Sequence, residues 1–262
     1  MLIKEVNGKI PQIPNDCYVA ENATIIGDVI FGDNCSVWFN AIIRGDVNFI
    51  KIGNKVNIQD GAVIHCTYKK HPTIIGNNVS IGKNCLIHPN VSIYDNSIIG
   101  DNVVIHSNTV LGADAFYYKK KAEGFDQLIS VGRVVLKDNV HIGASCTIDK
   151  GVTGDTTVGI GTKIDNQVHI GHDSIIGKNC LIASQTGIAG CVIIEDDVTL
   201  WGQVGTNSGI SIGKGAVILG QTGVTKSVPG GKTYFGTPIT ESRAKLKEIA
   251  YLKRLMREEK KG

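Results

Sequence analysis

An isoleucine falls on every sixth position of the stretch Ile75-Gly-Asn-Asn-Val-Ser-Ile81-Gly-Lys-Asn-Cys-Leu-Ile87-His-Pro-Asn-Val-Ser-Ile93, and the spacing continues to Leu111. The same period returns from Val158 to Val224, where Thr206 alone is not apolar. A period of six matches neither a helix nor an ordinary strand, so each hexad must form one side of a coil. The stretch therefore predicts a repeat protein made of stacked coils.

The composition favours one elongated domain over two layered cores. Of the 262 residues, 32 are Gly, 6 are Pro and 42% are apolar, which is typical of a chain with many tight corners and small buried side chains. We expect residues 1–236 to form one continuous domain and residues 237–262 to carry a C-terminal helix. The formal net charge is +3 with Lys and Arg scattered along the chain, so no basic stripe for nucleic acid is evident.

The cysteines indicate a reducing environment. Four of the seven lie four places after the periodic apolar residue, in a slot that otherwise takes Val, Ala, Ser or Thr: Cys35, Cys85, Cys146 and Cys180. Small buried thiols explain this placement better than disulfides or metal ligands. The first residues form no signal peptide, and no segment approaches the ~18 apolar residues of a membrane span. We therefore expect a cytoplasmic protein.

The repeat is interrupted in three places, where inserted residues should project as loops. Its phase slips after Ile43, slips again over residues 66–72, and breaks over residues 113–131. This last and longest insertion holds four aromatic residues and a run of three lysines. Two interpretations stay open: the aromatic residues fold back as a lid over a flat side of the coil, or the loop forms one wall of a binding cleft.

After Val224 the repeat ends and a helix is predicted over residues 240–258. Thr237-Pro-Ile-Thr240 offers a cap and a first-turn proline, and four apolar residues then recur at helical spacing: Leu246, Ile249, Leu252 and Met256. This apolar stripe must pack on the coil or on copies of itself. The flat faces and open ends of a stack of coils also favour self-association.

The hexads have the form Ile-Gly-x-x-(Val/Cys/Ala)-x, as in Ile176-Gly-Lys-Asn-Cys-Leu181. This form resembles the hexapeptide transferases. The resemblance implies an all-β fold, a left-handed parallel β-helix with three hexads per coil, followed by the C-terminal α-helix. Residues 18 positions apart would then lie directly above one another, which pairs His88 with His106 and His172 with Gly190.

The first half of the chain resembles the gamma-class carbonic anhydrases. The resemblance is carried by Arg44-Gly-Asp46, by Gln59-Asp60, and by His65 and His88. In that family three histidines bind a divalent metal, and Lys83 stands here at the third position. A protonated lysine is no ligand, so we expect no metal site, and His106 is the only substitute nearby. Arg44, Asp46, Gln59 and Asp60 are expected to survive as a structural network at a subunit contact.

From residue 103 onward the chain resembles the UDP-3-O-acylglucosamine N-acyltransferases of lipid A biosynthesis. The motifs occur in order along the chain: Asp114-Ala-Phe-Tyr-Tyr118, Gly132-Arg-Val134, Ile142-Gly-Ala144, Thr147-Ile-Asp-Lys-Gly151, Ile164-Asp-Asn-Gln-Val-His-Ile-Gly-His172 and Gly187-Ile-Ala-Gly190. The resemblance implies that His172 is the general base and that the backbone N–H of Gly190 binds the oxyanion. An imidazole that titrates near neutrality suits deprotonation of an attacking amine, and a glycine leaves its N–H open to a substrate carbonyl.

The same resemblance predicts the substrate-binding residues, the acyl donor and the acceptor. We expect Phe116, Tyr118, Asn166, Gln185 and Gln203 to bind substrate, an acyl carrier protein or CoA thioester to donate the acyl group, and no cofactor to be needed. Lys119 to Lys121 would meet an acidic carrier protein. The acceptor would be a nucleotide sugar, and the assembly a homotrimer.

Two departures from that family leave alternatives open. Gly209 stands where the family has a further histidine, and carbonic-anhydrase-like hexads stand where the family has a uridine-binding domain. One alternative keeps the same base but uses a short acyl-CoA and another amino or hydroxy sugar. Another is a catalytically silent scaffold related to the anhydrases.

Overall fold

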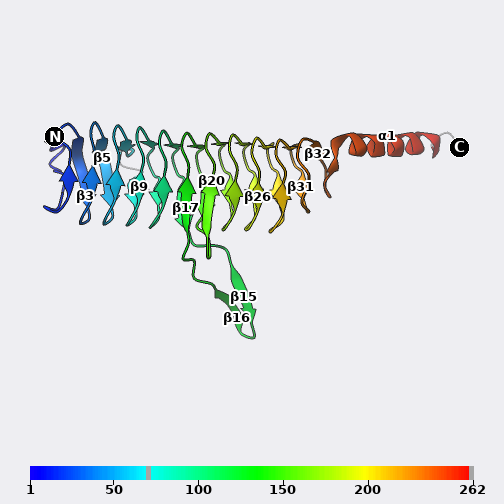
Figure 1. Ribbon diagram of the computed structural model, residues 1–262, viewed down its shortest axis with the longest axis horizontal. Coiled ribbons are helices and arrows are strands. Elements are labelled where there is room, and N and C mark those ends of the chain that lie inside the picture. Colours follow the sequence, from blue (N-terminus) through cyan, green and yellow to red (C-terminus); the bar gives the residue numbers. More distant parts are fainter. Residues whose placement is uncertain (69–71, 260–262) are drawn as a thin grey trace.

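The computed structural model describes residues 1–68 and 72–259, and these form a three-sided prism of stacked parallel strands (Figure 1). The first face is a ten-stranded sheet. Its strands are β2 (Tyr18–Val19), β4 (Ser36–Val37), β6 (Asn57–Ile58), β9 (Ser80–Ile81), β12 (Ile98–Ile99), β17 (Arg133–Leu136), β20 (Asp155–Val158), β23 (Ile175–Ile176), β26 (Ile193–Ile194) and β29 (Ser211–Ile212).

The other two faces are joined into one sheet because two long strands, β3 and β5, cross from one to the other. The second face holds β1 (Leu2–Lys4), β3 (Thr24–Phe31), β5 (Ile42–Ile52), β7 (Val63–His65), β10 (Leu86–Ile87), β13 (Val104–Ile105), β18 (His141–Ile142), β21 (Lys163–Ile164), β24 (Leu181–Ile182), β27 (Thr199–Leu200), β30 (Val217–Ile218) and β32 (Thr233–Phe235). The third continues from β3 and β5 through β8 (Thr73–Ile75), β11 (Ser92–Ile93), β14 (Val110–Ala113), β19 (Thr147–Asp149), β22 (His169–Ile170), β25 (Gly187–Ile188), β28 (Gly205–Thr206) and β31 (Gly223–Val224).

The hexad pattern explains both the core and the corners. Ile81, Ile87 and Ile93 are at most 1% exposed, and Ile87 pairs with Ile105 one coil further along, 18 residues away. Each corner needs one residue with positive φ, a conformation that asparagine tolerates better than most side chains. Six successive corners place asparagine there, with φ between 54° and 67°: Asn78, Asn84, Asn90, Asn96, Asn102 and Asn108. The predicted parallel β-helix of hexapeptide repeats is confirmed.

The four cysteines of the small-residue slot point inward as predicted. Cys35, Cys85, Cys146 and Cys180 are buried free thiols within the apolar core. They therefore fill the same space as the valines and alanines of other hexads.

The interruptions of the repeat behave differently from one another. The expectation of a projecting loop is wrong for the first slip, because residues 44–49 lie within the long strand β5. The chain rounds this corner where Gly27 and Gly45 cross so closely that a Cβ on Gly27 would lie 2.1 Å from the Gly45 carbonyl oxygen. Residues 69–71 of the second slip lie outside the described residues. The insertion 113–131 does project, as a hairpin of β15 (Tyr118–Lys121) and β16 (Gly124–Gln127) (Figure 1).

The C-terminal helix α1 spans Ser242–Glu259 and continues past the end of the prism (Figure 1). The expected first-turn role of Pro238 is wrong. Pro238 precedes β33 (Thr240–Glu241), which pairs antiparallel with β32, and the Glu241 carboxylate accepts from the Arg243 N–H at the start of the helix. Leu246, Leu252 and Met256 are 50% to 62% exposed, so most of the apolar stripe does not pack on the coil. Within the described part of the chain, no helix has the length and apolarity that a membrane crossing requires.

Neighbouring isoleucines of β26 test the assignment of inward and outward positions. Ile194 is 1% exposed and Ile193 is 47% exposed. We expect Ile194→Ala to reduce the free energy of unfolding by about 2–5 kcal/mol, because it leaves a cavity in the core. The matched Ile193→Ala change should cost less than about 0.5 kcal/mol. Urea unfolding measures both, and equal losses would contradict the inward register of the hexads.

Candidate active site

His172 lies at the corner of the prism between the third and first faces. It follows β22 by two residues, and β23 begins three residues after it. The neighbouring coil runs beside this corner, since the Gly171 N–H donates to the Ile188 carbonyl and the Cys191 N–H donates to the His172 carbonyl, both at 2.8 Å. The coil thus places His172 beside Gly190, as the count of 18 residues predicts.

The carboxylate of Asp173 orients the imidazole. His172 Nδ1 lies 2.8 Å from Asp173 Oδ2, and the two side chains are only 13% and 19% exposed. Burial opposes ionisation of Asp173, but hydrogen bonds from His172 and from the backbone N–H groups of Val152, Gly154 and Thr153 hold its pKa below the ordinary value. Because an ionised carboxylate only accepts, we assign the proton to Nδ1 and the lone pair to Nε2.

The backbone N–H of Gly190 is a buried donor without an acceptor among the described residues. At several other corners the equivalent N–H donates to an aspartate side chain of the next coil, as Asn77 does to Asp95 at 2.8 Å and Lys178 to Asp196 at 2.8 Å. The equivalent residue above Gly190 is Ser208, which supplies no such bond. Since an unpaired buried N–H is costly and rare, this donor indicates a place for a ligand oxygen.

Glycine at position 190 is also a steric requirement of the imidazole. A Cβ there would lie 2.4 Å from His172 Nε2 and 2.7 Å from Cε1. The basic nitrogen of His172 therefore lies against the Cα of Gly190, the residue whose N–H has no acceptor among the described residues. An arrangement of this kind can remove a proton from a nucleophile and stabilise the negative oxygen that forms on a carbonyl.

A second histidine and a buried carboxyl lie beside this centre. His169 Nδ1 is 2.8 Å from the Thr147 hydroxyl, and its Nε2 is 3.8 Å from Asp149 Oδ2. Asp149 is 7% exposed, and burial raises its pKa although His169 and His172 both act in the opposite direction. These groups add polar character to the floor of the site.

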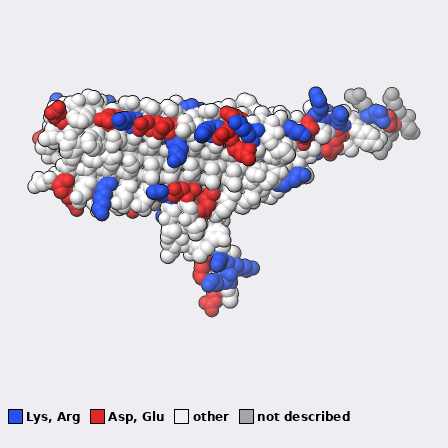
Figure 2. Space-filling model, in the orientation of Figure 1, with Lys and Arg blue, Asp and Glu red and all other residues white. Residues whose placement is uncertain are grey.

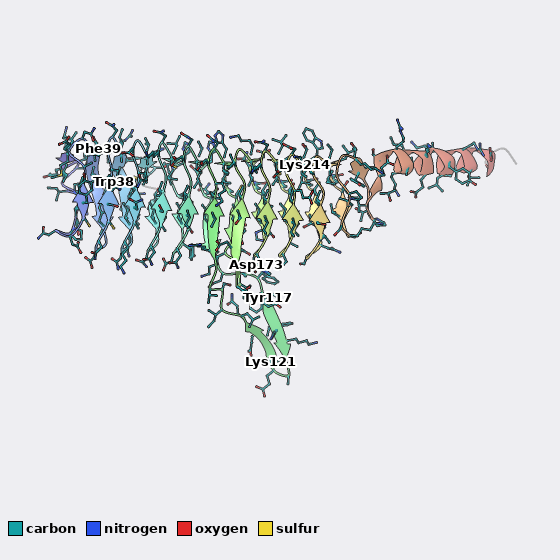
Figure 3. All side chains as sticks on the ribbon, in the orientation of Figure 1. Trp38, Phe39, Tyr117, Lys121, Asp173 and Lys214 are labelled. Carbon is teal, nitrogen blue, oxygen red and sulfur yellow. The ribbon has the colours of Figure 1, made fainter. Side chains whose placement is uncertain are left out.

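The projecting hairpin brings aromatic side chains over the corner (Figure 3). The Tyr117 ring meets the His172 imidazole at 5.4 Å between centroids in a T-shaped contact, and Phe116 contacts Tyr118 in the same way at 5.2 Å. A cavity of about 430 Å³ is lined by Phe116, Tyr117, Tyr118 and Phe125. Phe116 is 82% exposed and Phe125 70% exposed, so the lid over a flat face does not form and the loop stands as one wall beside the site.

Three of the residues expected to bind substrate lie at a different corner, between the second and third faces. Asn166 Oδ1 accepts from the Ala144 N–H at 2.7 Å. Gln185 and Gln203 belong to a ladder of amides in which each Nε2 donates to the glutamine one coil below, at 3.0 and 2.8 Å. One protomer therefore unites His172, Gly190 and the hairpin, but not these three residues.

In the described part of the first half, only two of the three ligand positions of the anhydrase-type metal carry a histidine, His65 and His88. The rings of His65 and His88 are 5.5 Å apart, and His88 stacks on His106 at 4.6 Å as predicted. Burial lowers the pKa of His65 and of His88, with further lowering from Arg44 and His106 respectively. Lys83 is paired with Asp60 at 3.5 Å. Lys83 therefore does not supply the third ligand that the anhydrase-type metal needs.

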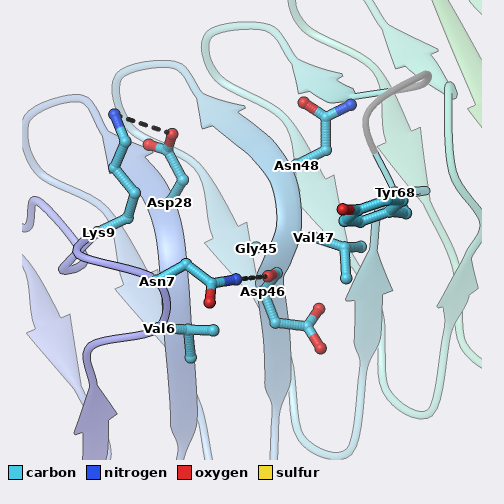
Figure 4. A pocket seen from close by; sticks show the side chains of 9 residues that line it. All are labelled: Val6, Asn7, Lys9, Asp28, Gly45, Asp46, Val47, Asn48 and Tyr68. Carbon is cyan, nitrogen blue, oxygen red and sulfur yellow. Dashed lines mark hydrogen bonds and ion pairs between the residues drawn. The ribbon is translucent and has the colours of Figure 1, made fainter.

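Within the chain, the four residues expected in a network at a subunit contact make two ion pairs and one amide hydrogen bond. Arg44 pairs with Asp46 at 3.4 Å, apart from the Lys83–Asp60 pair, and Gln59 donates to Asn57. A cavity of about 400 Å³ beside Asp46 is lined by polar side chains such as Lys9 and Asp28 (Figure 4). No histidine or cysteine lines it, so it offers no base of suitable pKa for acyl transfer.

Three residues of the site were missed by the sequence analysis as functional candidates. Asp173 directly follows His172, and a carboxylate next to a candidate base was a usable signal. Asp149 stood within a quoted motif but carried no spacing argument. Tyr117 was unpredictable, because its contact with His172 depends on how the hairpin leaves the coil.

Comparisons with known proteins first define the class. The sequence profile described as bacterial transferase hexapeptide (six repeats) matches residues 78–113 and 155–190. A second profile, the hexapeptide repeat of succinyl-transferase, matches residues 191–224. These coils are therefore similar to the hexapeptide repeats of bacterial transferases, as the fold indicates.

Two curated proteins and one solved structure show which acyltransferases the chain is most informatively compared with. The chain is 41% identical over 147 residues to UDP-3-O-acylglucosamine N-acyltransferase of Methylobacterium sp. (strain 4-46), covering 56% of this chain and 42% of the relative. The Caulobacter vibrioides (strain NA1000 / CB15N) protein of that name is 43% identical over 132 residues, covering 50% and 39%. The structure of Francisella novicida UDP-N-acetylglucosamine acyltransferase is 26% identical, covers 90% of this chain and 73% of that one, and has a TM-score of 0.58. The chain is thus similar to UDP-3-O-acylglucosamine N-acyltransferases over about half of its own length and spans about two-fifths of theirs.

The charge on Asp173 should make the corner sensitive to acid. A depressed pKa adds stability that is fully present above the ordinary value of 3.8 and is lost as pH falls through the lower folded value. We expect Asp173→Asn to cost about 2 kcal/mol at pH 7, as for hydrogen bonds to a charged group, and progressively less below pH ~4. Urea unfolding across pH measures this, with the exposed Asp126→Asn as control. A cost that stays constant with pH would refute the assignment.

Proposed function

We propose that this protein is an N-acyltransferase, which transfers a 3-hydroxyacyl group from a thioester to the amine of a UDP-glucosamine-type sugar. The observation that carries the proposal is the contact between His172 Nε2 and the buried residue Gly190, whose N–H has no acceptor among the described residues. The named relatives support the acyl reaction and the nucleotide-sugar acceptor. The reaction would belong to lipid A biosynthesis and would take place in the cytoplasm.

His172 acts as the general base in this proposal. The amine attacks the thioester carbonyl, and its proton passes to Nε2 as the tetrahedral intermediate forms. The new imidazolium keeps its Nδ1–H on Asp173, whose charge stabilises it. Collapse of the intermediate breaks the C–S bond, and the Nε2 proton passes to the departing thiolate.

Gly190 stabilises the oxygen of the intermediate. Its N–H has no protein acceptor to give up among the described residues, so it is ready before the reaction begins. A single donor of this kind is typically worth ~10²–10³ in rate. The reaction requires no metal or other cofactor, because the thioester is already activated.

The hairpin supports a lipid-like donor carried by a protein. Its cavity of Phe116, Tyr117, Tyr118 and Phe125 is apolar, which suits an acyl chain. Lys119, Lys120 and Lys121 lie at its outer end, where Figure 2 shows clustered positive charge. We therefore infer acyl carrier protein as the donor. The alternative with a short acyl-CoA predicts faster turnover with acetyl-CoA than with a long-chain acyl carrier protein.

We infer a homotrimer from the separation of the expected binding residues. In a threefold assembly each prism can present its His172 corner to the Asn166 corner of a neighbour. Asn166, Gln185 and Gln203 would then complete the site from the next subunit. The exposed stripe of α1 would meet its own copies.

Removal of the base should abolish activity without unfolding the protein. We expect His172→Ala to lower the rate of acyl transfer by about 10²–10⁴, since that is the usual contribution of a general base. His106→Ala is the matched control, because His106 is exposed and stacked on His88 at another corner. Initial rates of amide formation measure both, and unchanged transfer by His172→Ala would end the proposal.

Charge reversal at the hairpin should weaken recognition of the carrier protein. We expect Lys119→Glu combined with Lys120→Glu to raise KM for an acyl carrier protein on the order of tenfold at low ionic strength, and less at high salt. The control replaces Lys4 and Lys51, two exposed lysines of the first coils, in the same way. Equal effects in both double variants would show that only net charge matters.

The assembly is tested by mass. Sedimentation equilibrium should give three times the chain mass of 28.0 kDa. Leu252→Glu, which places a charge in the stripe, should shift the equilibrium toward monomer, whereas Lys247→Glu should not. A monomer of the unchanged protein would contradict the trimer.

A further inference from the structure

One set of possible metal ligands lies together in the described part of the chain, and it is at the active corner. Ligand atoms of His172, Asp173 and Cys191 all lie within 4.8 Å of one another. Cys191 occupies the corner position one coil above Asp173, with φ of 60°, and its N–H donates to the His172 carbonyl. The backbone ladder therefore holds the thiol beside the pair of side chains that the proposed reaction uses.

The thiol differs from the other cysteines of the coil. Cys35, Cys66, Cys85, Cys146 and Cys180 are buried in the core, whereas Cys191 is exposed. Partial desolvation, followed by the negative charge of Asp173, raises the pKa of the Cys191 thiol. A raised pKa argues against a nucleophile, which must be a thiolate. The same negative charge favours a cation at this point, and a bound cation would bring the thiol to its thiolate form.

We propose that His172, Asp173 and Cys191 form an inhibitory site for Zn²⁺. Nitrogen, oxygen and sulfur donors together are the ligands that zinc accepts, and three protein ligands leave a fourth position for solvent. Each Asp173 oxygen already accepts two hydrogen bonds, so the metal replaces one of them, and the bond from His172 Nδ1 is the one within the cluster. Binding releases the thiol proton to solvent, and no electrons are transferred.

Zinc at this site removes the base whichever nitrogen it binds. A neutral imidazole has one lone pair and one N–H. If the metal takes Nε2, the lone pair is used directly. If it takes Nδ1, the proton moves to Nε2, which then donates instead of accepting. The inhibition rests on the proposed function, but the binding of the metal does not.

Cobalt titration tests the binding without any activity assay. Full-length, tag-free protein is stripped with a chelator and titrated with Co²⁺, whose thiolate complexes absorb in the near ultraviolet. We expect one Co²⁺ per chain with a thiolate band, and displacement by Zn²⁺. Cys191→Ser should abolish the band and weaken zinc binding by at least about tenfold. Even residues that only hydrogen-bond to a metal ligand change metal affinity by about 10–100-fold when they are replaced. Cys17→Ser, at the other cysteine outside the core, should change neither.

An acyl-transfer assay then tests the inhibition. We expect Zn²⁺ to inhibit the unchanged protein reversibly, with recovery on chelation, and the inhibitory concentration to rise at least about tenfold in Cys191→Ser. Absence of a thiolate band, or an equal zinc affinity in Cys191→Ser, would overturn the site. Stoichiometric binding without inhibition would overturn its inhibitory role. Binding in a protein without acyl transfer would contradict the proposed function and leave the metal site standing.

Discussion

Each coil is held to the next by a parallel backbone ladder, in which paired residues lie 18 positions apart wherever no residues are inserted, and the other features depend on this ladder. It runs without a break in period from Leu181 through Thr199 to Val217, and it aligns each corner with the corners before and after it. A parallel ladder of this kind is possible because the inward residues are uniform and small enough to stack. The register of this ladder therefore determines which side chains fill the core, which residues meet at the site and where the inserted loops leave the coil.

The candidate site exists where the regular corner is altered. At several corners a carboxylate of one coil accepts the N–H of the coil below, which ties the two coils together. At Gly190 that tie is absent, because Ser208 of the next coil supplies no acceptor. The His172 imidazole lies against the Gly190 Cα, and the Gly190 N–H is left for a ligand. Because the Gly190 N–H makes no structural hydrogen bond, it can donate to an oxyanion.

The sequence predicts those features that depend on spacing alone. The inward isoleucines and the proximity of His172 to Gly190 both follow from counting hexads. Features that depend on side-chain rotamers do not follow, so the bond from His172 to Asp173 and the amides of Gln185 and Gln203 became visible only in the structure. The start of α1 was misjudged because Thr240 and Glu241 pair with β32, which competes with an earlier helix start.

The most direct test of the proposed chemistry is a crystal structure of the protein with the amide product of the reaction. The proposed function predicts that the carbonyl oxygen of the new amide accepts a hydrogen bond from the Gly190 N–H, while the amide nitrogen faces His172 Nε2. A product bound with its amide away from this corner, and with the Gly190 N–H left unpaired, would contradict it.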